Sequence, residues 1–399
     1  MVERANTTSH HHRARAWFPG IDRRAWCAAA LAAAASAAYA VPVSGQPPAV
    51  AFLGGVIWQF ALPAPLAQLP AFDDVRLYVA LRDGTLVALD HANGLPAWSA
   101  SRDATVAPLS MGPLLVGASG ATAWALDAAT GSPRWQHDLG AIVVLAPISA
   151  DAGPLFLTGA NDAVLLASQD GQEIWRQPLT GRATSSAAGA GGRAWVGLDD
   201  GRVLAMQTSS RAIQWTRTLP GAALVMTPLG DRLLVGSADN FLYALRVKDG
   251  GIAWRWRTGG DVVGAATADA RRVYFVSLDA TLRAIDLRHG DLRWQRPLAA
   301  RPVGGPALAG GVLVVAGVSP ELRGFKTGDG GLVGSAPLPG RALQGPLVAS
   351  ARGSIPARVL ITTAGGQVLA IGQTVEPRLV PLEFLPGRPL RPEVLPSFR

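Results

Sequence analysis

The sequence predicts an all-β protein, an eight-bladed β-propeller built from four-stranded antiparallel blades. Radial repetition of four-stranded sheets, with one blade about every forty residues, is typical of this architecture. Eight hairpin patterns begin near residues 75, 113, 154, 194, 232, 272, 312 and 358. Seven tryptophans recur with the same period, at Trp58, Trp98, Trp135, Trp175, Trp215, Trp254 and Trp294.

Each hairpin pattern consists of two short apolar runs on either side of a tight polar turn. The runs are rich in Val, Leu and aromatic residues, which favour strands. The turns contain pairs such as Asp83-Gly84 and Asp200-Gly201, which readily take the positive φ that a two-residue hairpin loop needs. Residues 233–238 read LLVGSA, without the alternation of a half-exposed strand. Such runs are expected where both faces of a strand are buried between neighbouring sheets.

The tryptophan series and the hairpins are offset by one repeat. Trp58 has no hairpin before it, the hairpin at residues 358–371 has no tryptophan after it, and the eighth position of the series is Gly334. A ring resolves the offset if residues 56–62 form a strand that completes the sheet begun by residues 358–371. We therefore predict that an N-terminal strand closes the last blade. A solenoid of eight unrelated hairpins, the alternative, leaves the offset unexplained.

The N-terminal forty residues resemble an export signal. Residues 13–24 hold four arginines, residues 25–38 are uncharged and rich in Ala and Leu, and residues 38–40 read Ala-Tyr-Ala. A charged segment, a short apolar segment and small residues at a cleavage site are typical of a secretory signal peptide. A retained N-terminal anchor is the alternative. Because Cys27 precedes the apolar segment, it does not match a lipid-modified cysteine.

The chain thus divides into a signal peptide or N-terminal anchor (1–40), a leader segment (41–54), the β-propeller (55–375) and a Pro-rich C-terminal tail (376–399). The tail contains six of the chain's 30 prolines, too many for a regular helix.

Composition and motifs exclude several classes of function. The net charge of +8 is spread without a Lys/Arg block, so we predict no nucleic-acid partner. One cysteine excludes a disulfide scaffold and a Cys-only metal site. No serine-hydrolase, zinc-protease or phosphate-loop motif occurs, and we predict no catalytic, cofactor-binding or metal-binding residue. Gly189–Gly192 is expected in an inter-blade loop, and His91, His137 and His289 are expected in solvated loops.

Three segments carry a resemblance to a known repeat. Residues 88–98, 125–135 and 284–294 approach the pattern Ala-x-Asp-x-x-Thr-Gly-x-x-x-Trp, which resembles the repeat of the pyrroloquinoline-quinone-like, quinoprotein-type β-propellers. The resemblance implies that the seven tryptophan rings dock between adjacent blades. It also implies a structural role for the repeat-loop residues Asp90, Gly94, Asp127, Gly131, Asp286 and Gly290.

Propellers of this superfamily are either quinone-dependent dehydrogenases or non-catalytic proteins. The dehydrogenases commonly carry an adjacent Cys pair and hold Ca²⁺ with Glu, Asn and Asp beside a catalytic Asp. This chain has one Cys, and its propeller has only two glutamates, Glu173 and Glu321. The sequence therefore favours a non-catalytic protein without a cofactor. A quinone-dependent dehydrogenase and a carbohydrate- or cell-wall-binding propeller are the alternatives.

In its eight predicted blades, its predicted export and its lack of catalytic motifs, the chain most resembles the propeller subunits of the outer-membrane β-barrel assembly machinery. That resemblance implies an exported, monomeric scaffold in the periplasm or cell envelope of a bacterium, with an envelope protein as partner, for example a barrel-assembly component. Membrane contact would arise only by association or through the N-terminal anchor. Loops 101–110, 180–192, 258–268 and 299–310 should join successive blades at one end of the ring. Trp256, outside the series, is a candidate partner contact.

Overall fold

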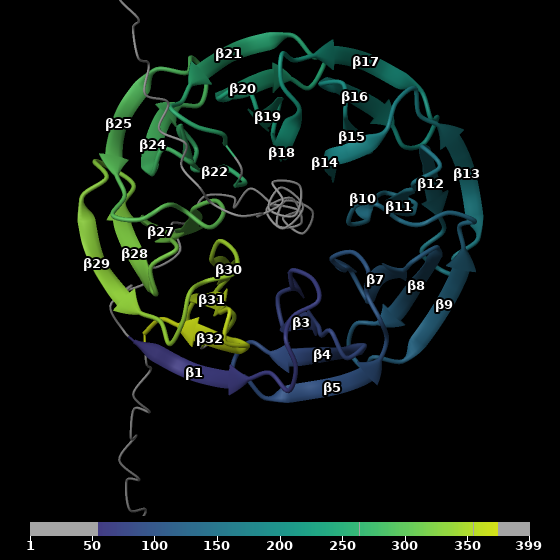
Figure 1. Cartoon of the computed structure of the whole chain (residues 1–399), viewed down its shortest axis with the longest axis horizontal. Helices are drawn as coiled ribbons and strands as arrows, with labels where there is room; N and C mark the ends of the chain where they lie inside the picture. The colour runs from purple at the N-terminus through teal and green to yellow at the C-terminus, as the bar shows by residue number, and fades with distance from the viewer. Residues whose placement is uncertain (1–54, 263, 354, 374–399) are drawn as a thin grey trace, which may run out of the picture.

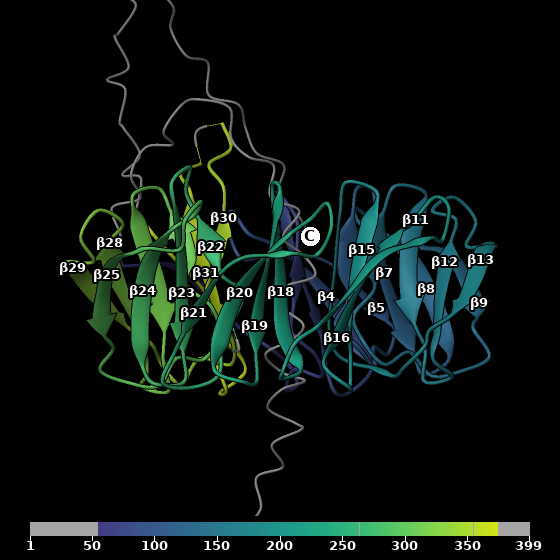
Figure 2. The ribbon, with the colours of Figure 1, turned by 90° about the horizontal axis from the view of Figure 1, so that it is seen from above.

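The computed structural model describes residues 55–262, 264–353 and 355–373, which form a ring of eight four-stranded antiparallel sheets (Figure 1). Within these residues every regular element is a strand. Seen from the side, the ring is a thick disc (Figure 2). The predicted eight-bladed, all-β architecture is therefore confirmed. The signal or anchor segment, the leader segment and the Pro-rich tail lie outside the described residues.

Each of blades 1 to 7 is built from four consecutive strands, named A to D from the middle of the ring outward. The A strands, with the closing blade last, are β2 (Ala71–Phe72), β6 (Leu109–Met111), β10 (Ile148–Ala150), β14 (Ala183–Ala190), β18 (Ala223–Leu229), β22 (Thr267–Ala268), β26 (Ala307–Ala309) and β30 (Leu347–Ala349). The B strands are β3 (Arg76–Ala80), β7 (Leu114–Ser119), β11 (Gly153–Leu157), β15 (Arg193–Leu198), β19 (Arg232–Ser237), β23 (Arg272–Ser277), β27 (Val312–Ala316) and β31 (Arg358–Thr362). The C strands are β4 (Thr85–Asp90), β8 (Thr122–Asp127), β12 (Asp162–Leu166), β16 (Arg202–Gln207), β20 (Phe241–Arg246), β24 (Thr281–Asp286), β28 (Glu321–Lys326) and β32 (Gln367–Ile371). The D strands are β5 (Pro96–Ser101), β9 (Pro133–Asp138), β13 (Glu173–Pro178), β17 (Ile213–Thr218), β21 (Ile252–Arg257), β25 (Leu292–Pro297), β29 (Leu332–Pro337) and β1 (Val56–Ala61).

The eighth blade joins the two ends of the ring. Its strand order is β1-β32-β31-β30, so the N-terminal strand β1 lies at the outer edge of a sheet made from the last three strands. Phe60 pairs with Val368 in an antiparallel register, and the amide of Gly372 donates to the carbonyl of Gly55 at 3.1 Å. The closure predicted from the offset of the repeats is confirmed.

Backbone hydrogen bonds define the two ends of the ring. After each D strand the chain bonds to the B–C turn of the same blade, as where the Arg102 amide donates to the Gly84 carbonyl at 2.8 Å. We call this end, with the D–A connections and B–C turns, the interblade face. Each C–D turn bonds instead to an A–B turn, as where the His91 amide donates to the Val75 carbonyl at 3.0 Å. This opposite end is the turn face, and the Gly55–Gly372 bond places the start of β1 there.

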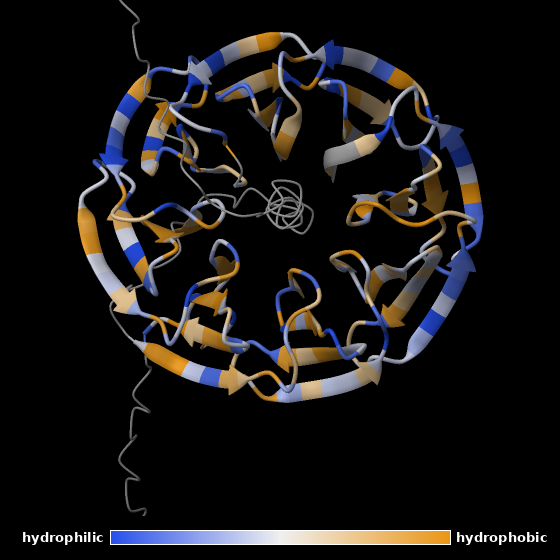
Figure 3. Cartoon of the chain, in the orientation of Figure 1, coloured by the Kyte–Doolittle hydropathy of each residue, from blue (hydrophilic) through white to orange (hydrophobic). Residues whose placement is uncertain are grey.

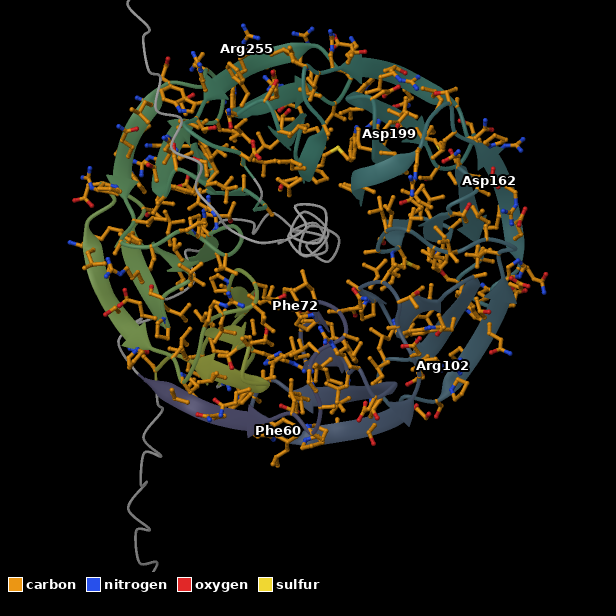
Figure 4. All side chains as sticks on the ribbon, in the orientation of Figure 1. Phe60, Phe72, Arg102, Asp162, Asp199 and Arg255 are labelled. Atoms are coloured by element: carbon orange, nitrogen blue, oxygen red, sulfur yellow. The ribbon has the colours of Figure 1, made fainter. Side chains whose placement is uncertain are left out.

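The hydrophobic core lies between blades. One cluster joins Leu234 and Leu242 of blade 5 to Val273 and Phe275 of blade 6, and similar clusters join other neighbours. Side chains fill the spaces between successive sheets (Figure 4). Hydrophilic residues concentrate on outer strands such as β9, β13 and β25 (Figure 3). Burying both faces of the B and C strands explains their continuous apolar runs.

The prediction for the 180–192 loop is wrong over most of its length. Residues 183–190 form β14, and Gly189 pairs with Ala194 of β15. A Cβ at Gly189 would lie 2.4 Å from the Ile148 side chain and 2.5 Å from the Ser149 carbonyl oxygen. The missing side chain therefore lets β14 approach the inner strand of blade 3. Residues 191–192 form the following turn, with φ of 56° and 71°.

Candidate interaction faces and the contacts that fix them

The seven tryptophans of the series all make the same contact. Each indole Nε1 donates to the carbonyl of the first C–D turn residue of the next blade, at 2.9–3.0 Å. The pairs are Trp58–His91, Trp98–Ala128, Trp135–Ser168, Trp175–Thr208, Trp215–Val247, Trp254–Leu287 and Trp294–Thr327. Seven of the eight outer strands are thereby bonded to the neighbouring blade at the turn face.

A glycine in the same turn lies against the ring. Six of these turns place a positive-φ glycine where a Cβ would come within 2.5–2.8 Å of the docked tryptophan, at Gly94, Gly131, Gly171, Gly250, Gly290 and Gly330. Only glycine combines this φ with so close an approach. In the turn that receives Trp175 the position is Arg211, which takes a φ of 64°.

Gly334, at the eighth position of the series, has no turn to contact. The next blade is the closing blade, whose C strand β32 is not followed by a D strand because β1 supplies it from the N-terminal side. A tryptophan at residue 334 would therefore lack the C–D turn that binds the other seven. The ring closure explains why this one repeat has lost its indole.

The repeat-loop aspartates hold the C–D turns. Asp127 accepts from the amides of Ala129 and Thr130, both at 3.0 Å, and its second oxygen accepts from Arg134 at 2.5 Å. Asp286 accepts from two turn amides in the same way. The Arg293 guanidinium and these amides hold the pKa of Asp286 well below its usual range. Asp90 bonds the Ala92 amide at 2.7 Å.

Trp256 does not lie on an open surface. It is half-buried and packs against the core cluster between blades 5 and 6. At the equivalent position of their strands, Arg217 and Arg296 donate to the carbonyls of Gly250 and Asp329 in the next blade, both at 2.6 Å. The structure thus puts Trp256 in an inter-blade position.

His91 is buried rather than solvated. Its side chain is 2% exposed, and Nε2 contacts the carbonyl of Asp74. Its own carbonyl accepts from Trp58 and from Arg358, each at 3.0 Å. The expectation failed because His91 occupies the turn that receives the closing strand. His289 is exposed and contacts Asp286, and His137 lies half-buried in β9.

The interblade face exposes an apolar side chain at the connection between blades 2 and 3. Ile142 is 62% exposed, and its carbonyl accepts from the Gly159 amide at 2.8 Å. A Cβ at Gly159 would lie 3.1 Å from Ile142 and 3.6 Å from Val144, so the two aliphatic side chains extend over that glycine. Sequence reasoning missed this site, although the apolar run 142–145 within a D–A connection was a usable signal.

Charged pairs flank the same face in other blades. Arg202 bonds Asp200 and both oxygens of Thr180. Despite the opposing effect of burial, hydrogen bonds from Arg283 and other donors lower the pKa of Asp279 to about 2. The Glu321–Arg323 pair, at 2.6 Å, lines a cavity of about 20 Å³, room for one water.

The turn face is divided by charge. In blades 1–3 its turns and flanking strand ends carry seven carboxylates and two arginines, namely Asp73, Asp74, Asp90, Asp127, Asp151, Asp170, Glu173, Arg76 and Arg134. In blades 4–8 they carry six carboxylates, namely Asp231, Asp249, Asp269, Asp286, Asp291 and Asp329. The same sector holds twelve cations: Arg193, Arg211, Arg232, Arg246, Lys248, Arg271, Arg272, Arg288, Arg293, Lys326, Arg352 and Arg358. We call the second part the basic sector.

Neither a metal cluster nor a membrane-spanning helix occurs in the part of the chain that the structure describes. No three His, Cys, Asp or Glu side chains there converge on a point that could hold a metal ion. Ca²⁺ in proteins takes six to eight oxygen ligands, and within the described ranges no three carboxylates converge to supply part of such a set. No helix within these ranges is long and apolar enough to cross a bilayer.

The fold and its contacts define an eight-bladed propeller of quinoprotein-type repeats, in which a tryptophan joins neighbouring blades at seven of the eight junctions. Residues 27–138, 119–229 and 199–380 match the profile of the family described as outer membrane protein assembly factor BamB. The chain belongs to this family.

Individual relatives have the same description. The chain is 30% identical to outer membrane protein assembly factor BamB of Nitrosomonas eutropha over 177 residues, which are 41% of this chain and 42% of the relative. It is 27% identical to that of Yersinia pestis over 238 residues, 52% of this chain and 60% of the relative. These alignments span about half the length of the curated relatives.

Solved structures show the same fold at low identity. BamB from Moraxella catarrhalis superposes with a TM-score of 0.64 at 19% identity, covering 80% of this chain and 99% of that one. Quinohemoprotein alcohol dehydrogenase from Comamonas testosteroni superposes at 0.66 and 12% identity, covering 94% of this chain and 83% of that one. At these identities the likeness concerns the fold alone.

Proposed function

We propose that this protein is an exported, non-catalytic scaffold of the bacterial cell envelope, which binds components of outer-membrane protein assembly through its interblade face. Membership in a family described as an outer membrane protein assembly factor supports the pathway. The inter-blade tryptophan contacts support the mechanism, because they make the ring a rigid frame for the loops it displays.

The pairing of Ile142 with Val144, rather than the exposure of Ile142 by itself, is the observation that carries the choice of face. The two side chains extend over Gly159, in a connection held by backbone bonds to the next blade. Because the backbone of this connection is already ordered, little conformational entropy is lost when a partner covers the exposed side chain. Arg202 and Asp200, on the interblade face of blade 4, supply charged groups of the kind found at the rim of a protein interface.

A crosslinked pull-down from native envelopes tests this proposal. Ile142→Glu should reduce the recovery of outer-membrane assembly components at least about tenfold, since a charge would be buried at the centre of the contact. Leu95→Glu is the matched control, because Leu95 is 63% exposed and lies at the turn face. Equal recovery with both variants would contradict docking at Ile142.

Two other outcomes would replace the proposal. Saturable binding of pyrroloquinoline quinone with Ca²⁺, together with quinone absorbance, would favour a dehydrogenase. A rise in melting temperature with a cell-wall glycan would favour a carbohydrate-binding propeller, because a ligand that binds only the folded state stabilises it.

A further inference from the structure

The basic sector presents a repeated pair of side chains on four consecutive blades. In blades 4 to 7, an exposed cation in or beside the C–D turn accompanies an exposed aliphatic residue that begins the D strand. The pairs are Arg211 with Ile213, Lys248 with Ile252, Arg288 with Leu292, and Lys326 with Leu332. The aliphatic side chains are 43%, 39%, 39% and 59% exposed in that order.

The four cations are free to bind an external anion. Within the described ranges none of them forms an ion pair with a carboxylate. By contrast, Arg246 and Arg293 of the same sector are paired with Asp249 and Asp286. The four repeated cations therefore belong to the unneutralised part of the sector.

The four pairs occupy one arc at one height on the ring. Strands β17, β21, β25 and β29 follow one another along the outer wall (Figure 1). In each of these D strands the aliphatic residue lies at the same β-bulge. It pairs with the penultimate residue of the C strand, as Ile252 pairs with Leu245. Equivalent positions in a ring of similar blades lie in one plane, so one flat surface can contact all four pairs.

Blades 1, 2 and 3 lack the pattern. At the start of the D strand, blades 1, 2 and 3 carry Pro96, Pro133 and Glu173. The charged side chains of those turns are acidic, as at Asp127 and Asp170, and the flanking Arg134 is paired with Asp127. The cationic and aliphatic pair thus belongs to one side of the ring.

We propose that the turn face of blades 4–7 docks on an anionic lipid bilayer, with the four cations near the lipid phosphates and the four aliphatic side chains in the headgroup boundary. Cations attract an anionic surface, and aliphatic groups at the interface add apolar burial. A second observation favours a bilayer over an acidic protein. Gly55 lies at the turn face of blade 8, bonded to Gly372, next to the four blades that carry the pairs. In the form that retains its N-terminal anchor, the apolar stretch at residues 25–38 is connected to the ring through this same end.

This inference concerns the end opposite the proposed protein-docking face, so it can fail independently of the proposed function. The two faces would act together, with the turn face at a bilayer and the interblade face directed away from it toward a partner.

Vesicle co-sedimentation of the full chain tests the inference. The probes are vesicles of equal parts phosphatidylglycerol and phosphatidylethanolamine, with phosphatidylcholine vesicles as the neutral comparison. The turn-face variant combines Arg211→Glu, Lys248→Glu, Arg288→Glu and Lys326→Glu. Its affinity for the anionic vesicles should fall on the order of 100-fold or more.

A matched variant controls for net charge. Arg182→Glu, Arg257→Glu, Arg301→Glu and Arg341→Glu change the same number of exposed cations at the interblade face, and the N-terminal segment is identical in both proteins. The control should bind within about threefold of the unaltered chain. Circular dichroism and urea unfolding establish that each variant is folded.

A second variant isolates the aliphatic contribution. Ile213→Ser, Ile252→Ser, Leu292→Ser and Leu332→Ser should leave low-salt binding nearly intact and remove the binding that survives at high salt, because salt screens only the charge attraction. The proposal is wrong if the two charge variants lose affinity equally, or if the unaltered chain binds both vesicle types alike. It is also wrong if the unaltered chain binds neither, and an acidic protein then becomes the partner to seek.

Discussion

Trp58 donates its indole N–H to the carbonyl of His91 at 3.0 Å. This bond joins the N-terminal strand to the blade that follows it, as the other six tryptophans of the series join their blades. Arg358 donates to the same carbonyl from the last blade, and burial lowers the pKa of its guanidinium. Blade 8 thus meets blade 1 at a seam that uses the common tryptophan contact with one added cation.

Loss of a docked tryptophan should strongly destabilise the ring. Trp215 is 8% exposed and bonds the Val247 carbonyl at 2.9 Å. Trp215→Ala should lower the free energy of unfolding by about 3–5 kcal/mol, through lost burial and a residual cavity. Urea titration measures it, with the exposed neighbour change Thr216→Ala as control. A loss no larger than the control's would show that the blades hold together without this contact.

The turn that receives Trp175 offers a stabilising change. Arg211 has a φ of 64° where the other turns use glycine, and a left-handed conformation costs an L-residue roughly 1–2 kcal/mol. Arg211→Gly should raise the free energy of unfolding by about 0.5–1 kcal/mol, after the entropy cost of glycine is deducted. A melting temperature at or below that of the unaltered chain would contradict this. In Gly131→Ala, the reverse change, the added Cβ would meet Trp98 at 2.6 Å and should destabilise.

The Asp279–Arg283 pair should make stability depend on acidity. The folded-state pKa of Asp279, about 2, is below its ordinary value of 3.8. The charged Asp279 therefore contributes its full stabilisation of the folded state at pH values above its ordinary pKa of 3.8. This stabilisation is lost as the pH falls toward about 2. Urea midpoints of the unaltered chain and Asp279→Asn should differ most near neutral pH and converge in acid. A gap independent of pH would assign the effect of the substitution to packing instead.

Removal of the closing strand should open the ring. Strand β1 contributes Ile57, Trp58 and Phe60 to a cluster with Leu77 and Val368. Deleting residues 41–62 should expose that cluster and the edge of β32, lowering the melting temperature and increasing binding of an apolar dye. Deleting residues 41–54 alone is the control, since β1 remains. If both deletions melt alike, β1 does not close the ring.

The sequence by itself determined the architecture, because the architecture repeats. Evenly spaced tryptophans, Asp-Gly turns and apolar runs indicate the local structure of each blade. The offset of the series at Trp58 and Gly334 indicates that an N-terminal strand closes the ring. The environment of a single residue was harder to predict from the sequence where another blade supplies its neighbours. His91 was expected in solvent, yet it is buried because the closing strand and Arg358 lie against its turn.

Only the tertiary structure decided which surfaces the chain presents. Residues 183–190 form a strand that pairs with β15, and Gly189 lets this strand approach blade 3, a contact that no local pattern reveals. The basic sector likewise gathers turns far apart in the sequence onto one end of the ring, whereas the linear sequence shows only thinly spread charge. The periodic pattern predicts the blades because the contacts behind it lie within each repeat. The composition of each face depends on the closed ring, because only the ring places turns from distant parts of the sequence side by side.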